Sequence, residues 1–239
     1  MNKMRTLEIT TYIGCPVKCD YCPQDKLLLS YRGGKIMTLN NFKKFLWKVP
    51  KDVRIDFSGF SEPFYNPETI SMMQFAYNSN YHLVLYTTLD VLTKEDIRKL
   101  KNIRFDEVVF HKYPNSSEKW DEIREEFERE VQSGRIAEIT EQWKWSRASN
   151  LWTIPYKPGP GHCLFAGKLF NHNVLLPNGD VVICCQDYSL KHIIGNLHEK
   201  TYNDLNRMYL RLLSDEEDSE LLCRNCELFQ SDSRSGCCI

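Results

Sequence analysis

The stretch LEITTYIGCPVKCDYCP, residues 7–23, decides the fold that we predict. Its first part, residues 7–12, is rich in β-branched and aromatic side chains, which predicts a β-strand. Its second part carries three cysteines, Cys15, Cys19 and Cys22, in a C-x3-C-x2-C pattern. Three thiols therefore follow directly after the first predicted strand.

The same alternation continues along the first 145 residues. Four further β-rich runs are predicted as strands, at residues 53–57, 82–87, 107–111 and 136–143. Polar runs with helical periodicity separate them, at residues 39–48, 68–78, 93–101 and 118–132. Strands separated by helices predict βαβ units and a parallel α/β sheet, either open or curled into a barrel. Side chains that carry chemistry then belong at the carboxyl ends of the strands.

The helix predicted at residues 118–132 illustrates this periodicity. Trp120, Ile123, Phe127 and Val131 fall on one face, which we expect to be buried, and the charged residues form a solvated face.

The composition and the pattern of the sequence change after residue 150. Residues 153–163, TIPYKPGPGHC, are rich in proline and predict a linker. Residues 173–185, NVLLPNGDVVICC, predict a hairpin in which a Pro-Asn-Gly-Asp turn joins two apolar runs. A helix is predicted at residues 202–213. We expect two domains, a main one at residues 1–152 and a smaller one at residues 153–239.

Charge and hydropathy exclude several classes of protein. The 31 basic and 32 acidic residues leave a net charge of -1, so no overall positive field favours a nucleic-acid partner. No apolar run is long enough for a membrane helix, and the polar N-terminal segment does not resemble a secretion signal, so we expect a cytoplasmic protein. The ten cysteines then predict metal or cluster binding rather than disulfides.

The three clustered cysteines suit an iron–sulfur cluster. Three thiolates can bind three corners of a 4Fe-4S cubane and leave the fourth iron open for another ligand. Structural zinc sites use four ligands and usually pair two C-x2-C units, which this spacing does not supply.

With Tyr21 before the third cysteine, this motif resembles the signature of the radical S-adenosylmethionine (SAM) superfamily. After the second predicted strand, residues 58–63, SGFSEP, resemble the Gly-Gly-Glu-Pro-like motif that contacts the SAM amino group, with Ser61 where a second glycine is common. The resemblance implies a partial (β/α)6 TIM-like barrel. It also implies a set of SAM-binding residues, namely Tyr21, Gly59, Ser61, Glu62, Thr87 and Thr88.

Residues 146–151, SRASNL, resemble a Ser-Arg-Ala-Gly-Asn-Leu-like stretch that ends many such barrels. Arg147 is then expected to contact SAM or substrate. In this family an electron from the cluster cleaves SAM to a 5'-deoxyadenosyl radical, which removes hydrogen from the substrate.

The distal cysteines form a second set. Cys163, Cys184, Cys223 and Cys226 supply four thiols around the predicted hairpin and helix, which suits zinc or a second iron–sulfur cluster. The pattern C-x15-G-x4-C followed by C-x2-C resembles the twitch extension of radical SAM enzymes, related to SPASM domains. That resemblance implies one auxiliary 4Fe-4S cluster.

Together these motifs are similar to radical SAM dehydrogenases of the 2-deoxy-scyllo-inosamine type, which oxidise a secondary alcohol. The resemblance implies an oxidoreductase acting on a sugar, aminosugar or cyclitol, with Arg147 and Asp187 binding or deprotonating the hydroxyl. It also implies a reducing partner such as flavodoxin or ferredoxin.

Three alternatives stay open. Cys185 is either a small buried residue or a hydrogen-atom donor, and the second role would make the enzyme an epimerase. The protein could instead modify peptides. From another class, it could be a non-catalytic zinc or iron–sulfur protein. Cys237 and Cys238 have no predicted role, and His111 either faces the substrate or packs in the structure.

Overall fold

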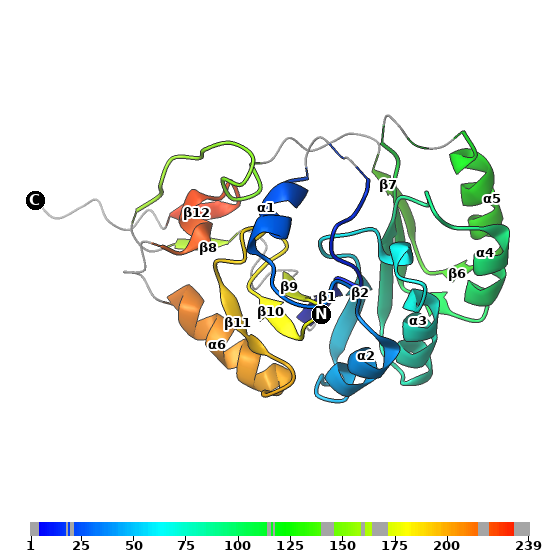
Figure 1. The fold of residues 1–239 in the computed structure, drawn as a ribbon, viewed down its shortest axis with the longest axis horizontal. Helices are drawn as coiled ribbons and strands as arrows, with labels where there is room; N and C mark the ends of the chain where they lie inside the picture. Colours follow the sequence, from blue (N-terminus) through cyan, green and yellow to red (C-terminus); the bar gives the residue numbers. More distant parts are fainter. Residues whose placement is uncertain are drawn as a thin grey trace, which may run out of the picture.

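A computed structural model shows the fold of the chain (Figure 1). It describes residues 5–231 apart from several gaps, and the side chains of residues 162, 172, 213 and 214 are not described. The gaps are residues 18, 20–21, 114–115, 117, 140–145, 159–160, 164–171 and 215–219.

One large sheet organises the molecule, in the strand order β11-β10-β9-β1-β2-β3-β5-β7. Six neighbouring strands, from β9 to β7, run parallel, and β10 and β11 continue the sheet antiparallel. Their bounds are β1 Arg5–Ile9, β2 Val53–Phe57, β3 Leu83–Thr87, β5 Glu107–His111, β7 Ile136–Ile139, β9 His172–Leu175, β10 Asp180–Val182 and β11 Ile193–Asn196. The predicted parallel α/β sheet is confirmed.

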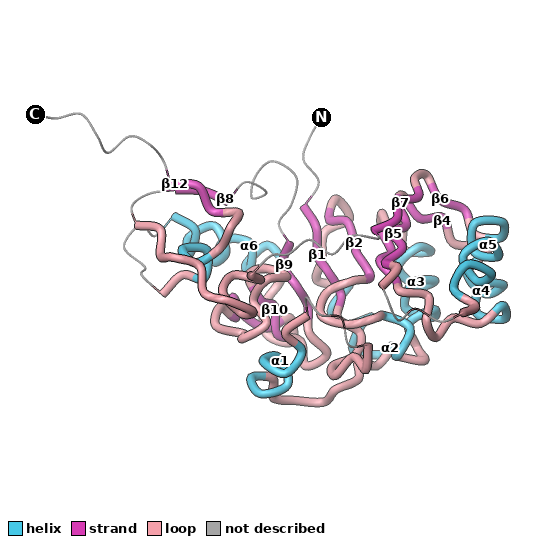
Figure 2. Tube along the Cα trace, turned by 90° about the horizontal axis from the view of Figure 1, so that it is seen from above, coloured by secondary structure: helices cyan, strands magenta, loops and turns pink. Residues whose placement is uncertain are grey.

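Most helices follow the strands and cover one side of this sheet, whereas the first helix packs on the other side, where Leu27 is buried with Val174 and Val182 (Figures 1 and 2). The α-helices are α1 Gln24–Ser30, α2 Leu39–Leu46, α3 Thr69–Asn78, α4 Lys94–Leu100, α5 Trp120–Glu130 and α6 Tyr202–Ser214. Two 3-10 turns are η1 Pro63–Tyr65 and η2 Leu222–Asn225. Two small sheets pair β4 Arg104–Phe105 with β6 Gln132–Ser133, and β8 Gly161–Cys163 with β12 Phe229–Ser231. No helix in the described part of the chain is both long and apolar enough to span a bilayer.

Local sequence accounts for how these helices begin and pack. Thr93 and Asp96 form a reciprocal capping box that starts α4. Trp120 and Phe127 on α5 and Val131 at its C-cap are buried, and Ile123 is half-buried against the same core, as the predicted apolar face requires.

The chain after residue 152 differs from the prediction in two places. The end of the predicted linker is a strand, because β8 pairs with β12 and brings Cys163 opposite Phe229. The predicted hairpin forms as β9 and β10, but β9 also pairs in parallel with β1, so that Val174 lies opposite Glu8. The large sheet therefore contains strands from both sides of the predicted domain boundary at residue 152. The division into two domains stays a prediction.

Candidate active site

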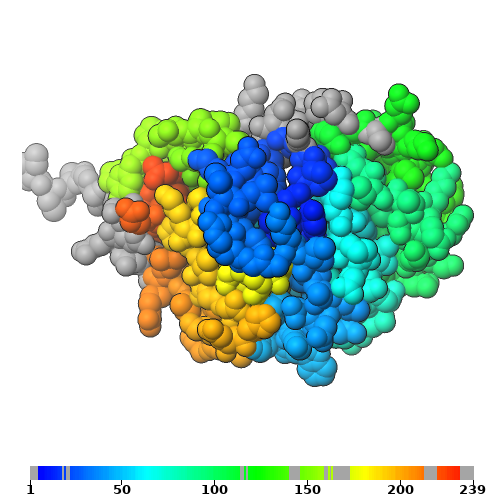
Figure 3. Space-filling view, in the orientation of Figure 1, coloured from blue at the N-terminus to red at the C-terminus, as the bar shows by residue number. Residues whose placement is uncertain are grey.

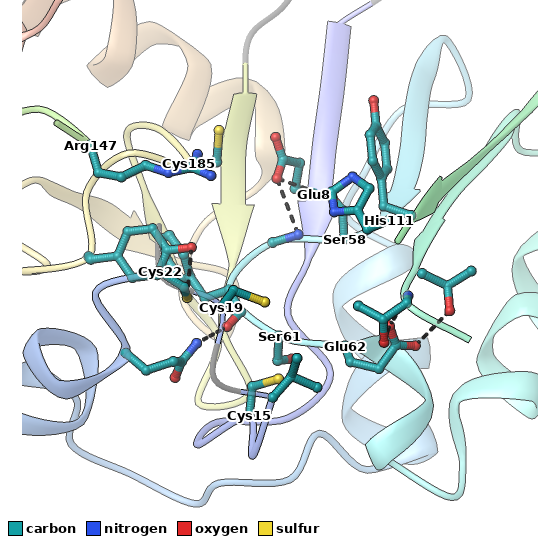
Figure 4. Close-up of a pocket in the computed structure, with 18 residues that line it drawn as sticks. Glu8, Cys15, Cys19, Cys22, Ser58, Ser61, Glu62, His111, Arg147 and Cys185 are labelled. Carbon is teal, nitrogen blue, oxygen red and sulfur yellow. Dashed lines mark hydrogen bonds between the residues drawn. The ribbon is translucent and has the colours of Figure 1, made fainter. Parts of the chain in front are cut away.

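A cavity opens at the carboxyl ends of the first parallel strands, where the sequence predicted it (Figure 4). In Figure 3 the segment that holds α1, in blue, lies across the yellow region of β9 to β11. Residues from β1, β3, β5 and the start of α1 line the cavity, together with the loops after β1, β2, β3 and β10 and the turn that holds Arg147. They are Glu8, Cys15, Val17, Cys19, Cys22, Gln24, Ser58, Gly59, Phe60, Ser61, Glu62, Tyr86, Thr87, Thr88, His111, Arg147, Cys185 and Tyr188.

The three cysteines of the first set line this cavity together. Burial raises the pKa of the Cys15 thiol to about 11 and also raises that of Cys22. Both thiols are therefore protonated until a metal displaces the proton, as metal ligation by thiolates requires. Tyr21, predicted to bind the cofactor, lies outside the described residues.

The turn after β2 has a conformation that depends on glycine. Gly59 has a φ of +75°, and a Cβ there would lie 2.3 Å from the Thr10 side-chain oxygen. The hydroxyl of Ser61, on the same turn, is buried against the cavity and has no hydrogen-bond partner among the described residues. A turn with free space above its backbone and an unpaired hydroxyl fits a bound polar group such as the SAM amino acid.

The carboxylate of Glu62 joins this turn to the end of β3. It accepts hydrogen bonds from the Thr88 amide at 2.6 Å, the Thr88 hydroxyl at 3.0 Å and the Thr87 hydroxyl at 2.9 Å. Burial raises the pKa of Glu62 to about 7, although these hydrogen bonds act in the opposite direction. The structure thus brings Glu62, Thr87 and Thr88 together, and it shows both threonines donating hydrogen bonds to the Glu62 carboxylate. Their contact with a cofactor stays a prediction.

Arg147 reaches the cavity from an unusual turn. Arg147, Ala148 and Ser149 have φ values of 54°, 51° and 64°, a run of left-handed residues that costs roughly 1–2 kcal/mol for each non-glycine residue. Contacts hold the turn, because the Asn150 amide donates to the carbonyls of Arg147 at 2.7 Å and Gln186 at 2.9 Å. Such maintained strain is typical of functional sites.

The structure gives no support to the predicted catalytic role of Asp187. Asp187 is fully buried and does not line the cavity. Its carboxylate accepts hydrogen bonds from the amides of Lys191 at 3.0 Å and His192 at 2.8 Å. The side chain therefore stabilises the loop after β10.

Cys185 and His111 do line the cavity, on opposite sides of it (Figure 4). The Gln186 amide lies 3.7 Å from the Cys185 sulfur. Burial, and secondarily Arg147, lowers the pKa of His111 to about 4, so its ring is neutral near pH 7. Its Nε2 atom is buried without a hydrogen-bond partner in the described part of the chain.

Glu8, Tyr86 and Tyr188 also line the cavity, and the sequence interpretation missed them. The Glu8 carboxylate accepts hydrogen bonds from the Ser58 hydroxyl at 3.1 Å and the Gly59 amide at 3.2 Å. A carboxylate inside a strand predicted to be buried was the available signal for Glu8.

The second cysteine set is assembled from distant segments. Cys163 ends β8, Cys184 follows β10, Cys223 lies in the 3-10 turn η2, and Cys226 directly follows that turn. Burial raises the pKa of Cys223 to about 12, with smaller contributions from the neighbouring Cys226 and Cys163 thiols. The Cys223 and Cys226 thiols act electrostatically on Cys184, in the direction that raises its pKa. Across the described residues, no three histidine, cysteine or acidic side chains are close enough to hold one metal ion.

Known proteins resemble this chain in both sequence and fold. Residues 163–227 match the SPASM family, an iron-sulfur cluster-binding domain. The structure is similar to BtrN in complex with AdoMet and 2-DOIA, with a TM-score of 0.72 and 18% identity over 93% of this chain and 92% of that one. The chain has the radical SAM fold.

Two further radical SAM structures are similar to the chain. That of anSMEcpe with bound AdoMet has a TM-score of 0.55 and 15% identity, over 93% of this chain and 86% of that one. That of Streptococcus suis SuiB bound to precursor peptide SuiA has a TM-score of 0.51 and 13% identity, over 95% of this chain and 70% of that one. None of the curated proteins matches the sequence. The predicted partial barrel and its SPASM-related extension are confirmed.

Proposed function

We propose that this protein is a radical SAM dehydrogenase that oxidises a secondary alcohol of a sugar, aminosugar or cyclitol. The main support is the cavity, whose lining includes the three cysteines of the first set together with Arg147 and Glu8. Similarity to BtrN, whose structure holds AdoMet and 2-DOIA, supports this choice among radical SAM reactions.

The residues present fit the cofactors. Cys15, Cys19 and Cys22 would hold a 4Fe-4S cluster with one open iron. The backbone of the Gly59 turn and the Ser61 hydroxyl would bind the amino-acid part of SAM. When bound, the cluster and SAM supply a 5'-deoxyadenosyl radical that takes a hydrogen atom from a substrate carbon.

The cavity side chains bind and orient the substrate. The Arg147 guanidinium binds the substrate hydroxyl oxygen. Glu8 takes the role first predicted for Asp187 and accepts the hydroxyl proton at its carboxylate, since the other buried carboxylate of the cavity, Glu62, is held by Thr87 and Thr88. Neutral His111 donates to or accepts from a second polar group of the substrate. Val17 and Phe60 supply apolar walls that exclude water.

The second cysteine set and the electron donor complete the proposal. Cys163, Cys184, Cys223 and Cys226 would hold one auxiliary 4Fe-4S cluster, a group able to accept the second electron of alcohol oxidation. A flavodoxin or ferredoxin would reduce the first cluster, and the reducing conditions that both clusters need suggest a cytoplasmic location.

Anaerobic reconstitution tests the proposal. The protein should be brown, hold about eight iron atoms, and release 5'-deoxyadenosine on reduction with SAM. With a panel of aminosugars and cyclitols, one substrate should give a ketone in equal amount to 5'-deoxyadenosine. A colourless protein that binds only zinc would contradict the enzyme proposal, and turnover of peptides alone would contradict the substrate class.

Epimerisation is a second candidate because Cys185 lines the same cavity. In that reaction the Cys185 thiol would give its hydrogen atom to the substrate carbon radical. Turnover in deuterated water separates the two: a dehydrogenase leaves no carbon-bound deuterium in the product, whereas an epimerase leaves one. A Cys185→Ala variant would lose the deuterium only in the second case.

A further inference from the structure

Tyr188 links the loop of the second cysteine set to the first cysteine set. It lies four residues after Cys184, in a loop where the Asp187 amide donates to the Cys184 carbonyl at 3.0 Å. The Asp187 carboxylate holds the other side of this loop through the amides of Lys191 and His192. The loop therefore has a fixed shape, and Tyr188 projects from it into the cavity.

The Tyr188 side chain is buried and its ring is packed in place. The ring lies 4.6 Å from that of Phe60, measured between centroids, and only 5% of the residue is exposed. Phe60 directly follows Gly59 in the turn that we assign to SAM. The tyrosine is thus held by the same turn that shapes the cofactor space.

The Tyr188 hydroxyl reaches a sulfur of the first set. Its oxygen lies 3.6 Å from Cys22 Sγ, within hydrogen-bond distance for sulfur. A thiolate bound to iron has no proton, so the hydroxyl is then the donor. Cys15 differs, because the donors to its sulfur are the backbone amides of Glu62 and Val17.

Hydrogen bonds to cluster sulfurs are one of the factors that set the reduction potential of an iron–sulfur cluster. A donor stabilises the reduced cluster more than the oxidised one, because the reduced cluster carries one more negative charge. The low-potential cluster of the proposed reaction must be reduced before any substrate is touched, so a donor at Cys22 eases that step.

We infer that Tyr188 is a positioning residue that donates a hydrogen bond to the Cys22 thiolate and raises the reduction potential of the cluster held by the first cysteine set. This inference rests on the proposed function, since it requires that cluster. It extends that function by giving the loop of the second cysteine set control over the first site.

The test is a redox titration of the reconstituted holoenzyme, followed by electron paramagnetic resonance. The signal that changes on addition of SAM identifies the first cluster. In Tyr188→Phe, the ratio of reduced to oxidised cluster at a fixed potential should fall about ten-fold, equivalent to a shift of about 59 mV for a one-electron couple. Tyr86→Phe is the matched control, since it removes another hydroxyl from the same cavity, and it should leave the potential unchanged.

Activity gives a second measurement. Tyr188→Phe should cleave SAM slowly with a weak reductant and at the wild-type rate with a stronger one, a rescue that a purely structural defect would not show. An unchanged potential would overturn the inference alone, and so would loss of the first cluster in the variant, because Tyr188 would then hold the site together rather than tune it. A wild-type protein without a SAM-responsive signal would overturn the proposed function as well.

Discussion

The two cysteine sets differ in how the chain assembles them. Cys15, Cys19 and Cys22 belong to one loop, and all three face the cavity. The second set comes from three separate segments around β8, β10 and η2, and none of its members lines the cavity. The local set can leave one coordination position open, whereas a set of four fills all positions of a cluster.

This difference separates two functions. A site on a single loop beside a cavity can exchange ligands, which suits binding of SAM and substrate. A site built from distant segments ties those segments together and suits a group that only exchanges electrons. The predictions below test that separation.

The largest effect is expected at the first set. Cys19→Ala should abolish SAM cleavage, because a cluster with two remaining ligands is lost from the cavity, and iron content should fall to about half. Iron analysis and 5'-deoxyadenosine measurement check both outcomes. Cys185→Ala is the matched control for iron, and a Cys19→Ala protein with full iron content would argue against this ligand.

At the second set, replacement of Cys223 and Cys226 together with alanine should also remove about half of the iron. SAM cleavage should persist while ketone formation is lost, since the first cluster remains. The melting temperature should fall, because metal binding stabilises the segments that it joins. Unchanged iron content would refute the auxiliary site.

Arg147→Lys should lower kcat/KM by about 100-fold, because lysine cannot reproduce the planar guanidinium and a small misplacement of substrate has effects of this size. Iron content should not change, since Arg147 is not a ligand. Steady-state kinetics with the substrate found in the panel measure the loss, and wild-type kinetics in the variant would show that Arg147 does not touch substrate.

The smallest of these effects concerns pH. His111 has a folded pKa near 4 against an ordinary 6.5, so between these values the unfolded chain binds a proton that the folded chain does not. Stability should therefore fall as pH drops from 6.5 to 4, by about 3 kcal/mol at most. His111→Asn should flatten this part of the profile in denaturant titrations of the cofactor-free protein. An equally steep profile in the variant would assign the slope to other groups.

Local patterns in the sequence predicted most of the fold. The predicted strands at residues 53–57 and 107–111 coincide with β2 and β5, and the Pro-Asn-Gly-Asp turn forms between β9 and β10. Gly179 in that turn has a φ of +88°, a conformation that favours glycine. These features depend on neighbours in the chain, which is why sequence alone reveals them.

The features that the sequence did not predict depend on contacts between distant residues. The pairing of β9 with β1 joins segments that no periodicity connects. Asp187 was misread because its partners are amides of a loop whose folding the sequence does not show. Tyr188 belongs to no sequence motif. Its proposed role depends on the contact between its hydroxyl and the Cys22 sulfur, which only the structure shows.

The parallel pairing of β9 with β1 also has a consequence for how the protein is made. Glu8, on the cavity wall, lies opposite Val174, so the sheet beside the cavity is incomplete until β9, far later in the sequence than β1, has left the ribosome. Contacts between such distant segments form slowly in folding. The first cysteine loop is therefore synthesised early and enclosed late, which leaves a period during biosynthesis when a cluster can be delivered to it from outside.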